Sequence, residues 1–460
     1  MFHHVPRVRL GLPIVAVLGV LSIAACGSSS SSTTTASSTA AATSSATTSA
    51  GSSSASTSTS SCGPKPGTAA TGTPIALGAI NTKQPGTDFT DIENMEGAYF
   101  ACVNANGGVN GHPINLIKLT EATQPAQIAA DATKLVQTDK VVGVSGSSSI
   151  LECTINSAYW QKNHYYVIAA GIAPECYSTP NYADVNMGPR YSSDGAVQYV
   201  LTLHPSKIVF DQSNVPGTGY IAAGPAALAA NAHVPITQLT ENVPINDADS
   251  VALKEVDDAG PNGAVVLNFT PPEALVILQA AQKLGLENRV KAWACSTPCN
   301  TDFLATSLGS KWDGKFFVNA ELADPDDTNT PTMNLYKAIL KQYGSDVSGG
   351  IGSFSEMGFT MGEIAVHALG SITGPYTTAS VNKAFQSVSN YDTGMLCQPW
   401  TFGNYPLHIA NNMDYTVTPM NGKMVLKQGC TLISAVDPQI AAYRKAAGTA
   451  PLAPGQPSGS

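Results

Sequence analysis

The sequence predicts an α/β protein of two Rossmann-like lobes, each built on a central sheet of mostly parallel strands. Short apolar segments alternate with segments of helical periodicity, which is typical of βαβ units whose sheet is covered on both faces. The alternation then restarts in the second half of the chain. The residues that follow the low-complexity N-terminal part of the 460-residue chain are also too many for one ordinary hydrophobic core. We therefore expect two consecutive α/β halves.

The first half starts with a buried strand and a helix that ends at the glycine-rich turn Asn106 to Gly111. Later, an apolar run that begins at Val141 leads into the turn Gly146-Ser147-Ser148-Ser149, after which helical spacing resumes. The predicted strands of this half lie at residues 75–80, 112–119, from 141 and 165–170, and the predicted helices lie at residues 91–106, 124–138 and 151–164.

The second half repeats the alternation and ends in a long return. Its predicted strands lie at residues 207–210, 236–239, 263–268 and 290–294, and its predicted helices lie at residues 219–232, 249–259 and 272–284. Three further helices, after an acidic loop through Asp324, are predicted at residues 333–343, 354–369 and 381–388. The tail at 407–432 is predicted to be β structure, with Asn421-Gly422 as a hairpin turn.

Residues 1–25 have the layout of a secretory signal. Arg7 and Arg9 precede an apolar run, Leu10 to Ala25, that is shorter than a membrane-spanning helix, and small residues come just before Cys26. This arrangement resembles a bacterial lipoprotein signal, in which Cys26 becomes the lipidated first residue of the mature chain. An ordinary signal peptide cleaved nearby is the alternative. We expect a lipid anchor on the outer face of the cytoplasmic membrane.

Residues 26–72 are predicted to form a disordered linker. From Gly27 to Ser61 the chain contains only Ser, Thr, Ala and Gly, so it has neither large apolar side chains to bury nor charges. A flexible chain of this length has a root-mean-square reach of roughly 30 to 35 Å. The net charge of −9 and the pI near 5.3 argue against a nucleic-acid partner.

The nine cysteines divide into Cys26 and an even set of eight. Behind an export signal, an even set favours disulfides over catalytic thiols or zinc ligands. Eight cysteines allow 105 pairings, among which we expect the pairing of sequence neighbours. These pairs are Cys62 with Cys102, Cys153 with Cys176, Cys295 with Cys299, and Cys397 with Cys430. A zinc site that begins at Cys295 and Cys299 is the alternative, although no second pair or clustered His follows.

The candidate ligand site lies in the loops after the strands, because open parallel sheets bind ligands at the carboxyl ends of their strands. The serine turn ends a strand and opens a helix, where free N–H groups and the helix dipole favour an anionic or polar group. Capping of the helix by Ser148 or Ser149 is the alternative. The candidate ligand-binding residues are Phe89, Ser147, Ser148, Ala170, Gly171, Ile172, Asp211, Thr270 and Ser296.

Enzymatic patterns are incomplete in this sequence. The run from Gly143 to Ser147 lacks the last glycine of a Gly-x-Ser-x-Gly nucleophile turn, so a hydrolase that uses Ser145 or Ser148 is an alternative with little support. Gly217-Thr218-Gly219 is half of a dinucleotide fingerprint, with Ala222 in place of the third glycine. The histidines are scattered without metal-ligand spacing. We predict a binding protein, with no enzymatic activity, no cofactor and no metal.

Four segments, taken together and in their order along the chain, strengthen this prediction: Asn106 to Gly111, Gln124 to Gln127, Gly143 to Ser149, and Gln279 to Leu286. Together they resemble the leucine/isoleucine/valine-binding family of solute-binding proteins, which serve ABC importers. The resemblance covers roughly residues 75–403. It implies a type I periplasmic-binding-protein fold, in which the chain crosses three times between two lobes and hinge closure clamps the ligand.

The resemblance also implies residue roles and domain boundaries. It maps ligand contacts onto Ser147, Ser148 and residues 170–172, and it supports the pairing of Cys153 with Cys176. Lobe 1 is expected at residues 73–204 with a return at 321–405, lobe 2 at 205–320 with a hinge return and tail at 406–436, and a flexible C-terminus at 437–460. The three crossings are expected near Leu203 to Ser206, Asn319 to Ala323, and Asn404 to His408.

Three positions depart from the amino-acid binders of that family. Ile172 stands where a hydroxyl is usual, no aromatic residue stands near Val215 and Pro216, and no acid stands near Ser296 or Thr297 to pair with an ammonium group. A buried ammonium without a carboxylate partner is costly, which disfavours a standard α-amino acid. The alternative is that Asp88, Asp211 or Asp302 replaces the missing acid. We predict a monomeric, lipid-anchored protein that delivers a small polar organic ligand to an ABC permease. The alternative is a sensor that presents its closed form to a membrane receptor.

Overall fold

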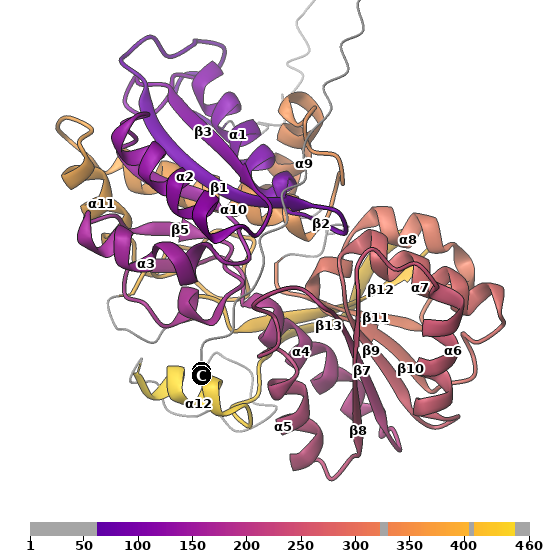
Figure 1. Ribbon diagram of the computed structural model, residues 1–460. Coiled ribbons are helices and arrows are strands. Elements are labelled where there is room, and N and C mark those ends of the chain that lie inside the picture. Colours follow the sequence, from indigo (N-terminus) through magenta and orange to yellow (C-terminus); the bar gives the residue numbers. More distant parts are fainter. Residues whose placement is uncertain (1–61, 323–329, 404–408, 447–460) are drawn as a thin grey trace, which may run out of the picture. The chain divides into compact units, whose positions relative to one another are not determined.

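The computed structural model describes residues 62–322, 330–403 and 409–446 (Figure 1). The predicted signal at 1–25, Cys26, the linker as far as Ser61, the acidic loop at Asp324 and the crossing at Asn404 to His408 lie outside the described residues. Within the described residues, no helix is long and apolar enough to cross a membrane. The described part contains two α/β lobes, as the alternation of strands and helices predicts.

The lobe 1 sheet has parallel strands in the order β3-β1-β4-β5-β6, and the short β2 pairs antiparallel with the end of β1. Its strands are β1 (Ile75–Gln84), β2 (Thr87–Asp88), β3 (Ile114–Glu121), β4 (Gly143–Ser147), β5 (Val167–Ala169) and β6 (Tyr182–Asp184). The sequence predicted all of these except the two short strands β2 and β6. Both are too short to show a periodicity of their own.

Helices cover both faces of the lobe 1 sheet because its strands are apolar on both sides. They are α1 (Thr90–Ala105), α2 (Pro125–Gln137), α3 (Glu152–Lys162), η1 (Pro174–Tyr177), α9 (Pro331–Tyr343), α10 (Ser353–Gly370) and α11 (Thr378–Ser387). On β1, Leu77 packs in a cluster with side chains of α1, α10 and α11. Ile80 points the other way and packs with side chains of α2 and α3, as the two-residue period of a strand requires.

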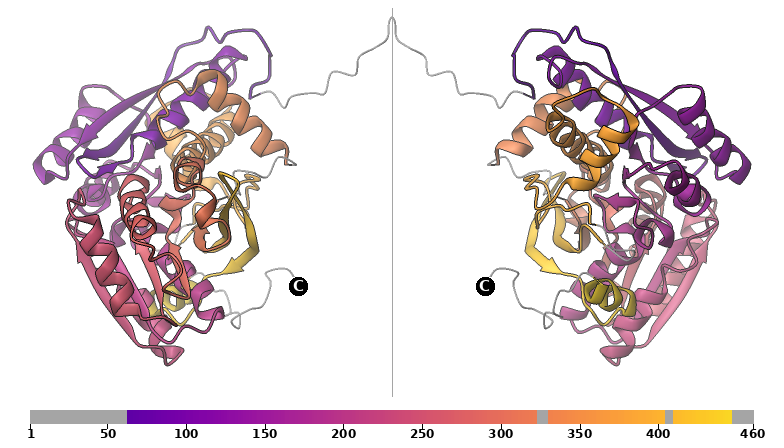
Figure 2. Two further views of the ribbon diagram at one scale, coloured as in Figure 1. Left: turned by 90° about the vertical axis from the view of Figure 1, so that its right-hand side faces the viewer. Right: turned by 90° about the vertical axis from the view of Figure 1, so that its left-hand side faces the viewer.

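The lobe 2 sheet has the strand order β13-β12-β11-β10-β9-β7-β8. Its strands are β7 (Ile208–Ser213), β8 (Ile236–Glu241), β9 (Ala264–Asn268), β10 (Ala292–Cys295), β11 (Phe316–Ala320), β12 (Met413–Met420) and β13 (Lys423–Leu432). The predicted hairpin is confirmed: Asn421 and Gly422 both have positive φ, and Met420 pairs with Lys423. The β12–β13 hairpin, coloured yellow, adds two antiparallel strands to the parallel part (Figure 2).

Helices also cover both faces of the lobe 2 sheet. They are α4 (Gly188–Thr202), α5 (Ala223–Asn231), α6 (Ala248–Ala259), α7 (Pro271–Lys283), η2 (Thr297–Cys299), α8 (Asp302–Leu308) and η3 (Ser310–Trp312). On β7, Phe210 packs in a cluster with side chains of α4 and α5. Its neighbour Val209 packs on the opposite face with side chains of α6, α7 and α8.

Helix α4 corrects the predicted first crossing. It packs against β9, β10, β11 and β12 and beside α5, so it belongs to lobe 2. The chain therefore leaves lobe 1 between β6 and α4, at residues 185–187, and the expected boundary at residue 204 is wrong. The sequence analysis missed this helix because it starts at Gly188-Pro189, a pair that also suits a loop.

Three crossing segments meet at the side chains of Asn411 and Glu321. Asn411 Nδ2 donates to Val185 O at 3.2 Å and to Glu321 O at 2.8 Å. The Glu321 carboxylate in turn accepts a hydrogen bond from Met187 N at 2.6 Å. Asn411, in the third crossing, thus binds the backbone of the first crossing at Val185 and the backbone of the second crossing at Glu321.

The described ends of the chain are more ordered than predicted. Residues 62–72 were expected in the linker, but Lys65 N donates to Asn106 O and Ala70 N donates to Asn104 O, each at 2.8 Å. Residues 437–446 were expected to be flexible, but they include α12 (Pro438–Ala446). The low-complexity composition ends at Ser61, so residues 62–72 do not share the composition that predicted the linker.

We call residues 433–446 the C-terminal segment. Its Tyr443 belongs to the same buried cluster as Tyr177 and Tyr182 of lobe 1. Its Val436 packs against the lobe 2 cluster that contains Phe210. The C-terminal segment thus contacts the cores of both lobes.

All four predicted disulfides are present: Cys62–Cys102, Cys153–Cys176, Cys295–Cys299 and Cys397–Cys430. The pairing of Cys295 with Cys299 makes the zinc alternative wrong. The first three disulfides each close within one lobe. Cys397 differs because its neighbour Leu396 packs in the lobe 1 core, whereas Cys430 lies on β13 of lobe 2.

Candidate functional site

Two neighbouring chambers, which share part of their lining, lie where the loops of both lobes meet. The inner chamber, with a volume of about 90 Å³, has the apolar lining residues Phe89, Ile92, Ile150, Val215, Phe269 and Met357. Its polar lining includes Ser148, Asn186, Ser213, Asn268 and Glu321. The outer chamber has a volume of about 380 Å³ and shares Thr87, Thr270, Pro298 and Phe354 with the inner one.

The polar groups of the inner chamber come from the carboxyl ends of parallel strands. Ser148 follows β4, Asn268 ends β9, and Glu321 follows β11. Open α/β sheets bind ligands in this place because the loops that leave adjacent strands diverge there. The sequence prediction of the site's location is therefore consistent with the position of the inner chamber.

The three serines of the turn have different roles. Ser148 lines the inner chamber, and its Oγ has no hydrogen-bond partner among the described residues. Ser147 is buried in the sheet, where its Oγ accepts a hydrogen bond from Ile80 N at 3.1 Å. Ser149 Oγ donates to Glu121 Oε1 at 2.8 Å. Of the three hydroxyls, the one on Ser148 is free to meet a ligand.

Helix capping does not explain these serines. Helix α3 begins at Glu152, and its N-cap residue Leu151 makes no side-chain hydrogen bond to the helix. The capping alternative for Ser148 or Ser149 is therefore wrong. The turn is shaped instead by Gly146, which has a φ of 92°. Residues other than glycine rarely adopt this backbone conformation.

Residues 170–172 reach the site mainly through Ile172, which lines the inner chamber. Ala170 is buried, and Gly171 O accepts hydrogen bonds from Tyr177 OH at 2.6 Å and from Asn186 Nδ2 at 2.9 Å. These bonds and the nearby Cys153–Cys176 disulfide fix the loop. Ala170 and Gly171 thus support the wall without being part of the described lining.

Phe89 and Thr270, two of the predicted ligand-binding residues, line the chambers. Phe89 lines the inner chamber and packs edge-on against Phe354, with ring centroids 5.3 Å apart. Thr270 lines both chambers, and its Oγ1 donates to Gly86 O at 3.1 Å. This bond joins a loop of lobe 2 to a loop of lobe 1 at the edge of the chambers.

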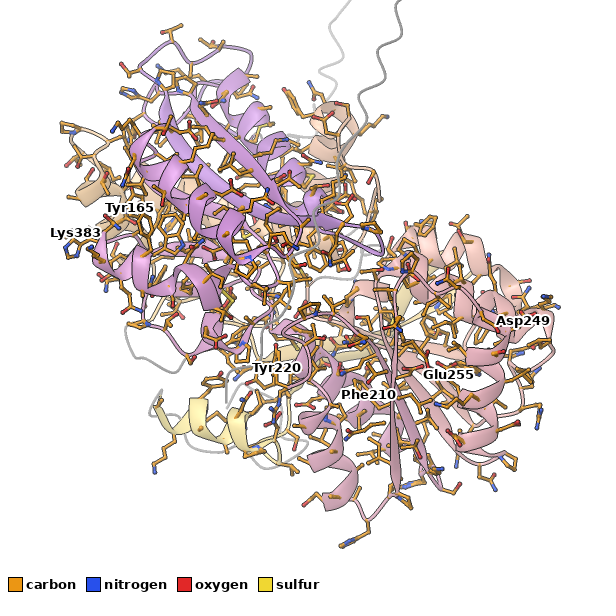
Figure 3. All side chains as sticks on the ribbon, viewed as in Figure 1. Tyr165, Phe210, Tyr220, Asp249, Glu255 and Lys383 are labelled. Atoms are coloured by element: carbon orange, nitrogen blue, oxygen red, sulfur yellow. A yellow bond between two sulfur atoms is a disulfide. The ribbon has the colours of Figure 1, made fainter. Side chains whose placement is uncertain are left out.

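Asp211 and Ser296 line neither chamber. Asp211, on β7, is buried and contacts Glu255 of α6, which is labelled in Figure 3. Burial raises the pKa of Asp211 to about 7. Ser296 Oγ donates to Asn268 Oδ1 at 2.7 Å and thereby orients an amide that does line the inner chamber.

Glu321 is the main lining residue that the sequence analysis missed. It lies just after β11, and it was treated only as part of a crossing. It is 2% exposed, and burial raises the pKa of its carboxyl to about 8. The signal was present in the sequence, because an acid directly after an apolar strand is at the ligand edge of a parallel sheet.

A hydrolase reading of the serine turn has no support in these contacts. Ser145 Oγ donates to Glu96 Oε1 at 2.5 Å and is fully buried in the sheet. No histidine is among the described residues that line the two chambers. A serine nucleophile needs a base within hydrogen-bond reach, and the hydroxyl of Ser148 contacts none.

The comparisons with known proteins agree with this architecture. A model of the periplasmic binding protein family matches residues 74–423. The chain belongs to the periplasmic binding protein family. This membership establishes a role in binding small molecules outside the cytoplasm. Among curated proteins, none matches the chain significantly.

Solved structures of other periplasmic binding proteins share this fold. A branched-chain amino acid ABC transporter protein from Thermus thermophilus with bound valine is 16% identical, with a TM-score of 0.69 over 80% of this chain and 99% of that one. A fatty acid ABC transporter substrate-binding protein from Thermomonospora curvata is 17% identical, with a TM-score of 0.67 over 82% and 97%. A solute-binding protein from R. palustris in complex with benzoate is 14% identical, with a TM-score of 0.63 over 78% and 96%.

Proposed function

We propose that this protein is a lipid-anchored extracellular solute-binding protein that delivers a small organic ligand to an ABC importer. The ligand is an amino acid, an amide or a related carboxylate with an apolar body. The observation that carries this proposal is the inner chamber, where the free hydroxyl of Ser148 faces an apolar lining contributed by both lobes.

The lining of the inner chamber supports a ligand of mixed character. Phe89, Ile150 and Phe269 offer apolar surface, whereas Ser148 and Asn268 offer hydrogen bonds. Small-molecule sites commonly combine an apolar wall with a few convergent polar groups that fix orientation. The proteins of similar fold have valine, a fatty acid and benzoate in their descriptions, and each of these has an apolar body and a carboxylate.

The N-terminal sequence supports the anchor and the location. Residues 1–25 have the layout of a lipoprotein signal, and Cys26 stands at the position of lipidation. The Ser/Thr/Ala-rich segment lies between Cys26 and Cys62, the first residue that the structure describes. Mass spectrometry of the membrane fraction tests this step: a diacylglyceryl group is expected on Cys26, and a free N-terminus cleaved elsewhere contradicts it.

A thermal-shift screen of the full chain against amino acids, amides, aromatic acids, fatty acids and short peptides tests the binding function. A ligand at 100 times its dissociation constant raises the free energy of unfolding by about 2.7 kcal/mol. We expect a reproducible rise in Tm with at least one member of the panel. Catalytic turnover of a bound compound, or no shift with any compound, contradicts the proposal.

A further inference from the structure

Glu321 is the one acidic side chain among the described residues that line the inner chamber. It is almost fully buried, and its Oε2 accepts a hydrogen bond from Met187 N at 2.6 Å. Its Oε1 has no hydrogen-bond partner among the described residues. One carboxylate oxygen is thus held by the first crossing, and the other remains available.

The surroundings of Glu321 provide no positive charge. The ionisable groups that act on it are two other buried acids, Asp184 at the end of β6 and Asp414 on β12. Neither lysine nor arginine is found in the described lining of the inner chamber. A buried anion without a cation is unfavourable. The empty chamber therefore favours the protonated form of the Glu321 carboxyl, and a cationic occupant would stabilise the ionised form.

The loop after β10 contributes no acid to the inner chamber. Thr297 stands there, and its Oγ1 donates to Asn319 Oδ1 at 2.5 Å. Asn319 Nδ2 in turn donates to Asp414. These groups form a buried network, and Glu321 is the carboxylate that a ligand in the inner chamber meets.

We propose that Glu321 receives the ammonium group of a ligand that has an apolar body. This inference rests on the proposed function and narrows its ligand class. The opposite polar end of the ligand, where there is one, faces the hydroxyl of Ser148 and the amide of Asn268. The aliphatic or aromatic body packs against Phe89 and Phe269.

Proton linkage gives this inference a measurable signature. Burial raises the pKa of Glu321 to about 8, so the empty chamber holds a protonated carboxyl at pH 7. An ammonium group favours the ionised form, and its binding releases a proton. Amine affinity should therefore rise up to about tenfold per pH unit until pH 8 and level off above it. A carboxylate of the same shape should show the opposite dependence.

The test uses the full chain and two matched pairs of probes, isoamylamine with isovalerate and benzylamine with benzoate. Isothermal titration calorimetry from pH 6 to pH 9, in buffers of different ionisation enthalpy, gives both the affinity and the number of protons released. We expect the amine of a pair to bind at least about tenfold more tightly than the carboxylate at pH 8. We also expect the release of close to one proton per amine at pH 7.

Glu321→Gln keeps an acceptor for Met187 N and removes the charge. It should lower amine affinity by at least about 30-fold and abolish its pH dependence. Glu255→Gln is the matched control, because Glu255 is a buried acid of lobe 2 that does not line the chambers. If Glu321→Gln does not fold, the proton release of the unaltered chain still decides the question.

Three results overturn the inference: tighter binding of the carboxylate at pH 8, amine binding without proton release, or full amine affinity in Glu321→Gln. A solute from the screening panel that binds while both amines fail also overturns it, and leaves the proposed function standing. If no panel compound and no probe binds, the proposed function itself fails.

Discussion

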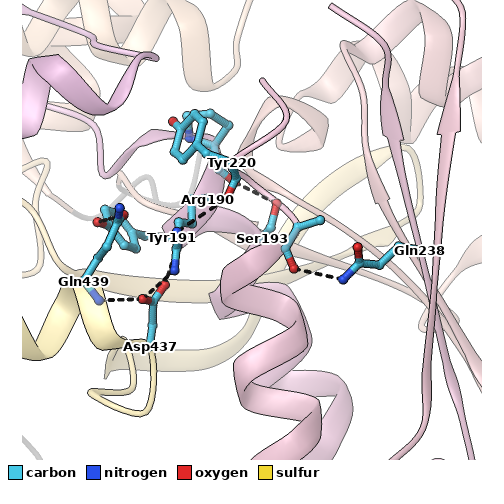
Figure 4. Close-up of polar contacts among 9 residues, drawn as sticks. Arg190, Tyr191, Ser193, Tyr220, Gln238, Asp437 and Gln439 are labelled. Carbon is cyan, nitrogen blue, oxygen red and sulfur yellow. Dashed lines mark hydrogen bonds and ion pairs between the residues drawn. The ribbon is translucent and has the colours of Figure 1, made fainter. Parts of the chain in front are cut away.

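The Arg190 guanidinium and the Asp437 carboxylate form a buried two-point ion pair, with Nε to Oδ2 at 2.7 Å and Nη2 to Oδ1 at 2.8 Å (Figure 4). Arg190 lies in the first turn of α4, and Asp437 belongs to the C-terminal segment. Arg190 Nη1 also donates to Tyr220 O at 3.4 Å, and Tyr220 OH donates to Ile172 O. The C-terminal segment is thereby connected to a wall of the inner chamber.

Removal of one partner of this pair should destabilise the protein strongly. Asp437→Ala leaves a buried guanidinium without its carboxylate, which typically costs about 3–5 kcal/mol of unfolding free energy. The double variant Arg190→Met with Asp437→Leu removes both charges and should recover most of that loss. Urea unfolding measures the free energy of unfolding of the single and the double variant. Equal losses in the single and the double variant would show that packing, and not the ion pair, is responsible.

Ser148→Ala and Ser147→Ala should separate ligand binding from sheet stability. The Ser148 hydroxyl is free in the chamber, so its loss should lower ligand affinity about five- to tenfold with little change in Tm. Ser147→Ala leaves the buried Ile80 N–H without its acceptor and should cost about 1–3 kcal/mol of stability. Calorimetric titration and thermal unfolding of both variants provide the comparison. Unchanged affinity in Ser148→Ala contradicts the assignment of the site.

Gly146→Ala should destabilise lobe 1 by more than about 2 kcal/mol. Its φ of 92° disfavours a side chain, and an added Cβ would collide with the Glu96 carboxylate. Gly67→Ala is the matched control, because Gly67 also has a positive φ of 74° but has open space around an added Cβ. The control should cost about 1 kcal/mol, which isolates the backbone effect. Equal losses measured by urea unfolding would argue against the collision.

Stability should fall as the pH rises from about 5 to about 8. Burial raises the pKa of Glu96 from 4.5 to about 8 and that of Glu93 to about 7. Because the folded pKa values exceed the unfolded ones, the folded state holds more protons, and the stabilisation present at low pH is lost through this window. Each group contributes a slope of up to about 1.4 kcal/mol per pH unit.

Glu96→Gln measures how much one of these carboxyl groups contributes to the pH dependence of the unfolding free energy. The variant cannot ionise, so its unfolding free energy should fall less steeply between pH 5 and pH 8 than that of the unaltered chain. Asp257→Asn, an exposed acid on α6, is the control and should keep the original slope. An unchanged slope in Glu96→Gln would show that the buried carboxyl keeps its ordinary pKa.

Local patterns predicted much of the fold. Apolar runs located the long strands, Asn421-Gly422 located the hairpin, and short sequence separation paired the cysteines. The predicted position of the boundary between the lobes was wrong, because it depends on more than local patterns. Whether α4 packs on the sheet before it or the sheet after it depends on tertiary contacts, which no local pattern records.

The candidate site shows the same division. The sequence predicted that the ends of parallel strands hold the ligand, and Ser148, Phe89 and Thr270 line the chambers. It could not predict that Ser147 and Asp211 point away, because side-chain direction at a strand end depends on register and on the bulge between Ser145 and Ser147. Glu321 was missed because Asn319 to Ala323 was considered only as a crossing between the lobes, although Glu321 also directly follows a strand.

The Cys397–Cys430 disulfide joins a segment packed in lobe 1 to strand β13 of lobe 2, and the third crossing lies between these two cysteines. The intervening chain is therefore a closed covalent ring. A protease that cuts once within this ring leaves the C-terminal fragment attached to the rest of the chain by a sulfur bridge, and the two fragments separate on a denaturing gel only after the disulfide is reduced.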